Sequence, residues 1–274
     1  MAAYICQTCG VQYAERSSPP AHCAICDDER QYVGADGQRW TTLPELRAIH
    51  ANAIVEVEPG LFRVGTIPEF AIGQHAFLVR TAEGNVLWDC TSLIDEATER
   101  AIHELGGVAA IAISHPHFYG SCVEWSRSFD APIFLPEADR SFVMRPDPAI
   151  RFYDRSPDIA VPGVLVTRVG GHFAGSAILH WAGADGQGVV LSGDSIAVGA
   201  DRASVTFMYS YPNGIPLSAQ DVRDLAGRAT EVGPFDRLYS AWPSAAIASG
   251  AQAAVQRSAE RYIGMLEGTW QRRP

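Results

Sequence analysis

Four cysteines near the N-terminus restrict what this chain can fold into more than any other feature. Cys6 and Cys9 form one C-x2-C pair, and Cys23 and Cys26 form a second. Two such pairs bring four sulfurs onto one tetrahedral metal ion, and a segment this short buries too little apolar surface to fold without a staple. We therefore predict a zinc-ribbon-like module over residues 1–40 that holds a structural Zn2+. A rubredoxin-like iron site and a pair of disulfides are the alternatives.

The role of this four-cysteine module, defined here as residues 1–40, is open at the level of sequence. A site closed by four sulfurs has no free position for a substrate, so we expect it to be structural rather than catalytic. Contact with a partner and the building of a lid over the main domain are both compatible with its composition.

The basic residues are unusual because all of them are arginine. The 274 residues carry 21 basic and 31 acidic side chains, which gives a formal net charge of −10, and no lysine occurs. Without lysine the chain forms no Schiff base and has no P-loop lysine. This excludes pyridoxal-phosphate, class I aldolase and Walker-type nucleotide chemistry. The acidic balance argues against nucleic acid as a partner.

No stretch of the sequence is apolar over a length that crosses a membrane. The longest apolar run, Gly106 to Ile113, is far shorter than the ~20 residues that a spanning helix needs. The first residues lack the charged start and apolar stretch of a signal peptide. We expect a cytoplasmic protein with a small-molecule substrate and no membrane partner, and the oligomeric state stays open.

The main domain, predicted over residues 41–274, alternates between strand-like and helix-like segments. An antiparallel meander comes first, because turn signals at Pro59–Gly60 and Gly84–Asn85 separate short apolar segments. The order of elements indicates two sheets packed face to face with helices outside, an α/β sandwich rather than a doubly wound sheet. Strands are predicted at 54–57, 61–64, 76–80, 86–88, 108–113, 132–135, 164–169, 177–181, 189–191 and 238–239. Helices are predicted at 93–105, 122–125, 136–144, 218–230 and 251–266, and a proline-rich loop contains Pro146, Pro148 and Pro157.

Three histidines and one aspartate stand at predicted strand ends. His115 and His117 follow an apolar strand in SHPHFYG, and residues two apart in an extended segment point to the same side. His172 lies in the glycine-rich segment GGHFAGS, and Asp194 lies in LSGDS directly after another apolar strand. Three imidazoles and one carboxylate form an open metal site, the type that catalyses reactions. The alternative is that the histidine pair is a hydrogen-bonded structural feature.

Taken in order, four motifs resemble those of the metallo-β-lactamase fold hydrolases. NVLWDC, which contains Asp89, resembles the strand of that family that ends in aspartate. SHPHFYG stands where the family has HxHxDH, GGHFAGS where it has GHxxGS, and LSGDS where it has its metal-bridging aspartate. The resemblance covers roughly residues 54 to 245. It implies an αββα sandwich with a metal centre at one edge.

Members of the resembled family with two metal ions have two adjacent metal sites. This chain departs from the family pattern at the residues of the second site. Tyr119 and Gly120 replace the last aspartate and histidine of HxHxDH, and Trp242 stands about where the family has a late histidine. The resemblance thus implies one complete site, made by His115, His117, His172 and Asp194. We predict one Zn2+ or iron ion in this domain.

Five residues near this site are assigned roles. Asp194 is predicted to accept a proton from the attacking water, and Tyr119 to donate a hydrogen bond to a developing oxyanion. Packing into the space of the lost second metal is the alternative for Tyr119. His75, on a strand that approaches the site in this fold, is predicted to bind substrate together with Tyr209 and Trp242. For these three the alternative is a purely structural or surface position.

Three functions are compatible with these features. The first is a single-metal hydrolase of a small-molecule ester, amide, thioester or lactone. The second is mono-iron oxygen chemistry, since iron members of the resembled family use two histidines and one aspartate; those members usually keep the motif residues that are absent here. The third is a non-catalytic, metal-stabilised binding or scaffold protein with the four-cysteine module as its contact surface.

Overall fold

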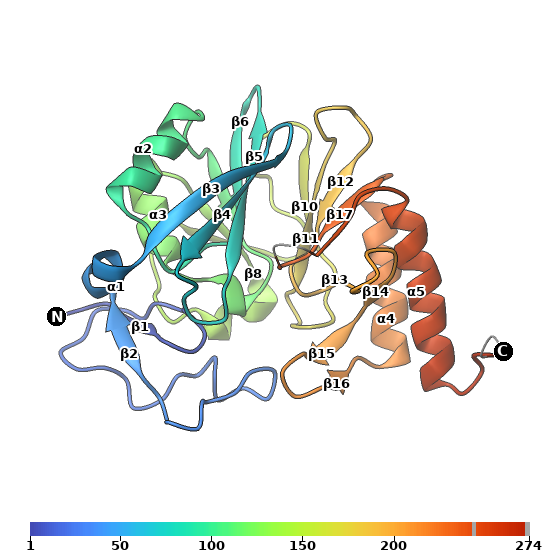
Figure 1. The fold of residues 1–274 in the computed structure, drawn as a ribbon, viewed down its shortest axis with the longest axis horizontal. Coiled ribbons are helices and arrows are strands. Elements are labelled where there is room, and N and C mark those ends of the chain that lie inside the picture. Colours follow the sequence, from blue (N-terminus) through green and yellow to red (C-terminus); the bar gives the residue numbers. More distant parts are fainter. Residues whose placement is uncertain (243–244, 272–274) are drawn as a thin grey trace.

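Two β-sheets packed face to face form the centre of the molecule (Figure 1). The structure is a computed structural model that describes residues 1–242 and 245–271. The first sheet has seven strands in the order β3-β4-β5-β6-β7-β8-β9. Their bounds are β3 (Ala51–Glu58), β4 (Leu61–Ile67), β5 (His75–Thr81), β6 (Gly84–Trp88), β7 (Ala110–Ala112), β8 (Ile133–Pro136) and β9 (Ile150–Tyr153). Strands β3 to β6 form the expected antiparallel meander, and β6 to β9 run parallel.

The second sheet has five strands in the order β10-β11-β12-β17-β18. Their bounds are β10 (Val164–Arg168), β11 (Ala177–Trp181), β12 (Val189–Leu191), β17 (Arg237–Tyr239) and β18 (Ala246–Ile247). Two short hairpins extend from it, β13 (Ala197–Val198) with β14 (Val205–Thr206), and β15 (Met208–Ser210) with β16 (Ile215–Pro216).

Helices cover the outer face of each sheet, which confirms the αββα sandwich. Helices α2 (Glu96–Glu104) and α3 (Cys122–Phe129) lie on the first sheet, and α4 (Ala219–Glu231) and α5 (Ala251–Leu266) on the second. The side chain of Asp95 accepts from the backbone N–H of Thr98 at 2.8 Å, and that of Ser218 accepts from Asp221 at 3.1 Å.

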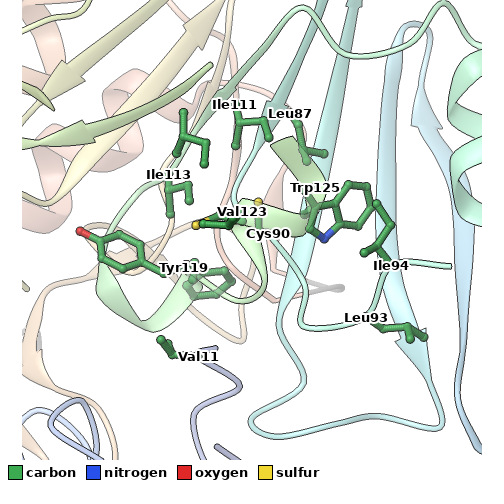
Figure 2. Packing of buried hydrophobic residues seen from close by; sticks show 14 of the residues in the cluster. Val11, Leu87, Cys90, Leu93, Ile94, Ile111, Ile113, Tyr119, Val123 and Trp125 are labelled. Carbon is green, nitrogen blue, oxygen red and sulfur yellow. The ribbon is translucent and has the colours of Figure 1, made fainter. Parts of the chain in front are cut away.

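The apolar side chains of the strands alternate between two layers, as the pleat of a strand requires. In the first sheet Leu87 and Ile111 point outward and share a buried cluster with Trp125 of α3 (Figure 2). Their neighbours Val86 and Trp88 point inward and pack against the second sheet. Strand β7 is buried on both faces, which explains why the run at residues 108–113 is continuously apolar.

The second sheet repeats this alternation. Ile178 and Val190 point outward to α4 and α5, whereas Leu179 and Leu191 point inward to the space between the sheets. The sandwich therefore has three apolar layers, and the ends of its strands meet along common edges.

The four-cysteine module lies against one end of the sandwich (Figure 1). Its strand β1 (Tyr4–Cys6) pairs with β2 (Trp40–Thr42), and α1 (Leu43–Ile49) leads from there into β3. Ile5 and Ile25 are fully buried and belong to the same apolar cluster as Leu87 of the first sheet. The boundary at residue 40 stays a prediction.

Several segments differ from their sequence-based expectation, among them the short strands β13 to β16 and β18, which the sequence did not predict. The proline-rich loop contains β9, an edge strand whose parallel pairing with β8 no local pattern revealed. The segment predicted as a short helix at 136–144 is a 3-10 helix, η2 (Glu137–Phe142), which is a tighter turn than an α-helix. Within the described residues, none of the helices has the length and apolar character to span a bilayer.

Candidate metal centre

His115 and His117 follow the C-terminal end of β7, which is an inner strand of the first sheet. His115 is extended, and the chain then turns into a short 3-10 helix, η1 (Pro116–Phe118). The imidazoles therefore converge through a turn rather than through the alternation of an extended strand. The ring centroids lie 5.1 Å apart, and both side chains are buried.

His172 reaches the same place from the loop that follows β10. Gly170 and Gly171, with φ of 75° and 89°, form the turn that aims it, a conformation that glycine adopts without strain. The Nδ1 atom of His172 lies 3.2 Å from the carbonyl oxygen of Met208. Its Nε2 atom lies 3.3 Å from Nδ1 of His117, so both nitrogens face one point.

Asp194 completes the group from the end of β12. Its Oδ2 atom lies 3.4 Å from Nε2 of His115 and 4.0 Å from Nε2 of His172. Its Oδ1 atom is buried and has no hydrogen-bond partner. We call these four residues, His115, His117, His172 and Asp194, the His/Asp centre.

The His/Asp centre fits a metal ion on geometry. One ligand atom from each of the four residues lies within 4.8 Å of the others, and all four residues are buried. A zinc–nitrogen bond of ~2.0–2.1 Å puts tetrahedral ligands ~3.3–3.4 Å apart, close to the shorter separations found here. Nε2 of His115 also lacks a hydrogen-bond partner, as does Oδ1 of Asp194. Buried polar atoms without a partner are costly unless an ion or another group occupies the site.

The protonation states also suit metal ligands. Burial, helped by the charge of the neighbouring His115, lowers the pKa of His172 to about 4 and the pKa of His117 well below its ordinary value. Burial raises the pKa of Asp194, but the hydrogen bond and charge of His115 outweigh it and hold this pKa below its usual range. Neutral imidazoles and an ionised carboxylate are the forms that bind metal.

Asp89 is connected to His115 through Ser114. Its Oδ1 accepts from the backbone N–H of Ser114 at 2.7 Å, and the Ser114 hydroxyl lies 2.8 Å from Nδ1 of His115. Burial raises the pKa of Asp89 to about 7. Asp89 was noted from the resemblance alone, without an assigned role. Partners of this kind orient a metal-binding imidazole.

A small cavity opens beside the His/Asp centre. Its volume is about 150 Å3, and its wall is mostly apolar. The residues around it are Arg30, Gln31, Tyr32, Ile72, His117, His172, Asp194, Tyr211, Pro212 and Trp242. A larger groove of about 480 Å3 lies at Arg140–Phe152, away from the ligand histidines. We take the smaller cavity as the candidate site because His117, His172 and Asp194 form part of its wall.

The predicted substrate-binding residues fall in different places. Trp242 lines the cavity, as does Tyr211. Tyr209 does not, and its hydroxyl donates to Glu29 at 2.7 Å. His75 lies across Gly65 on the neighbouring strand, outside the lining, where burial and then Arg63 lower its pKa. Substrate binding by these residues stays a prediction.

Tyr119 is placed away from the cavity wall. It is buried beside Val11 and Leu135, and its hydroxyl, which points away from the apolar cluster in Figure 2, has no hydrogen-bond partner. Burial, and next the charge of Asp139, raise the pKa of Tyr119 far above its ordinary value. Its catalytic role also stays a prediction.

The four cysteines of the N-terminal module converge in the same manner. Sγ of Cys6 lies 3.6 Å from Sγ of Cys26, and Sγ of Cys9 lies 3.6 Å from Sγ of Cys23. Zinc–sulfur bonds of ~2.3 Å place tetrahedral sulfurs ~3.8 Å apart, so the cluster fits one ion. No disulfide joins these cysteines. The identity of the metal stays a prediction.

Sequence reasoning missed Ile72 and Pro212 of the cavity wall, and with them three residues of the four-cysteine module, Arg30, Gln31 and Tyr32. The last three follow the second cysteine pair by a few residues and belong to no motif. The only available signal was the proposal that the module covers the main domain.

No protein-family model matches the chain. It is 48% identical over 266 residues to "Uncharacterized protein YmaE" of Bacillus subtilis (strain 168), an alignment that spans 96% of each chain. The chain belongs to the YmaE family. Because the alignment covers nearly the whole length, this member of the YmaE family and its Bacillus relative match across both the cysteine module and the sandwich.

Comparison with solved structures shows the fold of the main domain. VMB-1 matches with a TM-score of 0.58 and 8% identity, over 78% of this chain and 97% of the other. The DIM-1 metallo-β-lactamase matches with a TM-score of 0.53 and 12% identity, over 76% and 96%. The MIM-1 metallo-β-lactamase of Novosphingobium pentaromativorans matches with a TM-score of 0.51 and 18% identity, over 79% and 87%. The main domain therefore has the metallo-β-lactamase fold.

Proposed function

We propose that the chain is a single-metal hydrolase of a small, uncharged ester, amide, thioester or lactone. The observation that carries this proposal is the convergence of three imidazoles and one carboxylate beside a small apolar cavity. His115, His117, His172 and Asp194 would hold the ion, and we propose Zn2+. When bound, the metal supplies Lewis acidity and makes water a nucleophile near neutral pH.

The two carboxylate oxygens of Asp194 have different surroundings, and we assign them different roles. Oδ2 faces the ligand nitrogens, and Oδ1 is buried without a partner. Oδ1 is therefore free to accept the proton of the attacking water, which is general-base catalysis. The hydroxyl of Tyr211 donates to the backbone oxygen of Asp194 at 2.9 Å and so fixes the loop that carries the carboxylate.

The surroundings of the His/Asp centre support one ion rather than two. Among the described residues, no further histidine, cysteine or acidic side chain joins the four-residue cluster. Gly120 stands where the resembled motif has its last histidine. A β-carbon there would lie 2.6 Å from the backbone oxygen of Cys90 and 2.7 Å from that of Thr91. A histidine at this position would require the backbone to move.

The cavity supports an uncharged substrate. Arg30 is the cation of its described lining, and Asp28 already binds Nε and Nη2 of Arg30 at 2.6 and 2.7 Å. The remaining wall is formed largely by aromatic and aliphatic groups such as Ile72, Pro212 and Trp242. A cavity of ~150 Å3 encloses a group about the size of benzene. We propose that an acyl or lactone group of this size sits next to the metal.

Hydrolysis of a panel of short-chain esters, thioesters, amides and lactones by the zinc-loaded protein tests this proposal. We expect Asp194→Asn to lower kcat/KM by ~10²–10⁴, as the loss of a general base and ligand does. Asp154→Asn is the matched control, because Asp154 is exposed on the surface. Full activity of Asp194→Asn would contradict the site, and iron with oxygen-dependent turnover would contradict the hydrolytic reaction.

A further inference from the structure

The four-cysteine module contributes directly to the surroundings of the His/Asp centre. Arg30, Gln31 and Tyr32, which follow the second cysteine pair, line the cavity together with His117 and His172. In Figure 1 a loop of the module extends beneath the sandwich to the hairpin β15–β16. We call residues 28–32 the bridging segment.

Arg30 ties the bridging segment to the loop of His172. Its Nη1 atom donates to the carbonyl oxygen of His172 at 3.5 Å, and its guanidinium carbon lies 3.9 Å from the ring centroid of Phe173. Two guanidinium atoms of Arg30 donate to the Asp28 carboxylate. Only 14% of the Arg30 side chain is exposed. The guanidinium is therefore fixed in place rather than free to bind a ligand.

The other side of the cavity holds the bridging segment as well. The Nδ2 atom of Asn213 donates to the carbonyl oxygens of Glu29 and Gln31 at 2.8 and 3.1 Å. Tyr209 donates to the Glu29 carboxylate at 2.7 Å. The bridging segment is thus attached at both rims of the cavity, to the His172 loop and to the loop around Asn213.

Gln74 forms a second and independent tie. Its Nε2 atom donates to the carbonyl oxygen of Cys9 at 2.5 Å and to that of His117 at 3.0 Å. The side chain is buried, and the two carbonyls belong to the first cysteine pair and to a ligand of the His/Asp centre. One amide therefore links the two proposed metal sites through a single residue.

We propose that the four-cysteine module helps to position the ligands of the His/Asp centre. Arg30 and Gln74 are the positioning residues: Arg30 fixes the loop of His172, and Gln74 fixes the loop of His117. This inference goes beyond the proposed hydrolysis, because it concerns metal affinity and not the reaction. The physical reason is that a ligand loop anchored from outside presents its imidazole with less reorganisation. Loss of either tie loosens one ligand while leaving the four ligands themselves intact.

Cobalt(II) titration of the metal-free, full-length protein tests the proposal. Thiolate ligation gives a charge-transfer absorption that nitrogen and oxygen ligands do not give, so the two sites are read separately. We expect Arg30→Met and Gln74→Met each to raise the Kd of the His/Asp centre by ~10–100-fold, with the four-cysteine site unchanged in Arg30→Met. Arg39→Met and Gln7→Met are the matched controls, because both residues lie on the module surface outside the cavity lining.

Wild-type cobalt affinity at the His/Asp centre in both folded variants would overturn the proposal. If Gln74→Met does not fold, Arg30→Met together with Asn213→Ala decides, since each removes one of the contacts that attach the bridging segment to the cavity rims. Failure of the wild-type protein to bind a second ion would instead overturn the proposed function. The two proposals therefore fail by different observations.

Discussion

Gly171 lies so close to Leu225 that a β-carbon on the glycine would stand 2.7 Å from Cδ1 of that leucine. This contact joins the loop of His172, a member of the His/Asp centre, to helix α4. With its φ of 89°, position 171 permits no ordinary side chain without strain.

Gly171→Ala should therefore displace the His172 loop. We expect it to lower the free energy of unfolding by ~1–3 kcal/mol and to weaken metal binding at the His/Asp centre. Chemical denaturation and metal titration measure the two effects. Gly227→Ala is the control, because a β-carbon there meets nothing within 4 Å and position 227 lies inside α4. That variant should gain ~0.5–1 kcal/mol; equal behaviour of the two variants would contradict the packing argument.

Tyr119→Phe tests the predicted oxyanion donor. The hydroxyl of Tyr119 lies outside the cavity lining and has no partner. We therefore expect the variant to keep the wild-type kcat/KM and to be no less stable, since removing an unpaired buried hydroxyl removes a desolvation cost. A drop of ~10²–10³ in kcat would show instead that Tyr119 moves into the site during the reaction.

Asp139 should make stability depend on pH. Burial raises its pKa from 3.8 to about 6, although the backbone N–H of Gly175 donates to it at 2.8 Å. Between pH 4 and 6 the folded protein keeps this proton and the unfolded chain releases it, so stability falls as pH rises.

The size of this loss is about 3 kcal/mol for a shift of roughly two units. Denaturation of Asp139→Asn and wild-type protein at both pH values measures it. The asparagine variant should lack this component, because its amide does not titrate and its oxygen still accepts from Gly175. Parallel stability profiles of the two proteins would contradict the prediction.

Tyr32 should limit the length of the acyl group that the cavity accepts. Tyr32→Ala opens the wall formed by the bridging segment. We expect kcat/KM for longer acyl esters to rise ~10-fold or more relative to short ones, since each added methylene is worth ~1–3 kcal/mol in a fitted pocket. Tyr32→Phe keeps the ring and should retain the wild-type preference. An unchanged preference in Tyr32→Ala would place the acyl group elsewhere.

Local patterns in the sequence predicted the main elements of the fold. Turn residues between short apolar segments located the meander β3–β6, and the helices predicted at 93–105 and 218–230 are α2 and α4. These signals are local, because the period of a strand and the cap of a helix are set within a few residues. These signals did not predict strand β9, because its position depends on pairing with β8 rather than on a pattern in its own residues.

By itself, the sequence determined which side chains form the two groups able to hold a metal ion: the two cysteine pairs, and three histidines with Asp194, are specified by residue type and motif order. Only the tertiary structure decided what surrounds them. Arg30 and His172 are 142 residues apart in the chain, and no period or motif relates them. The tertiary structure also turned Tyr119 away from the cavity and placed Gln74 between Cys9 and His117. Contacts of this kind arise when separately formed loops pack at one edge of the sandwich, so their physical cause lies in packing and not in local sequence.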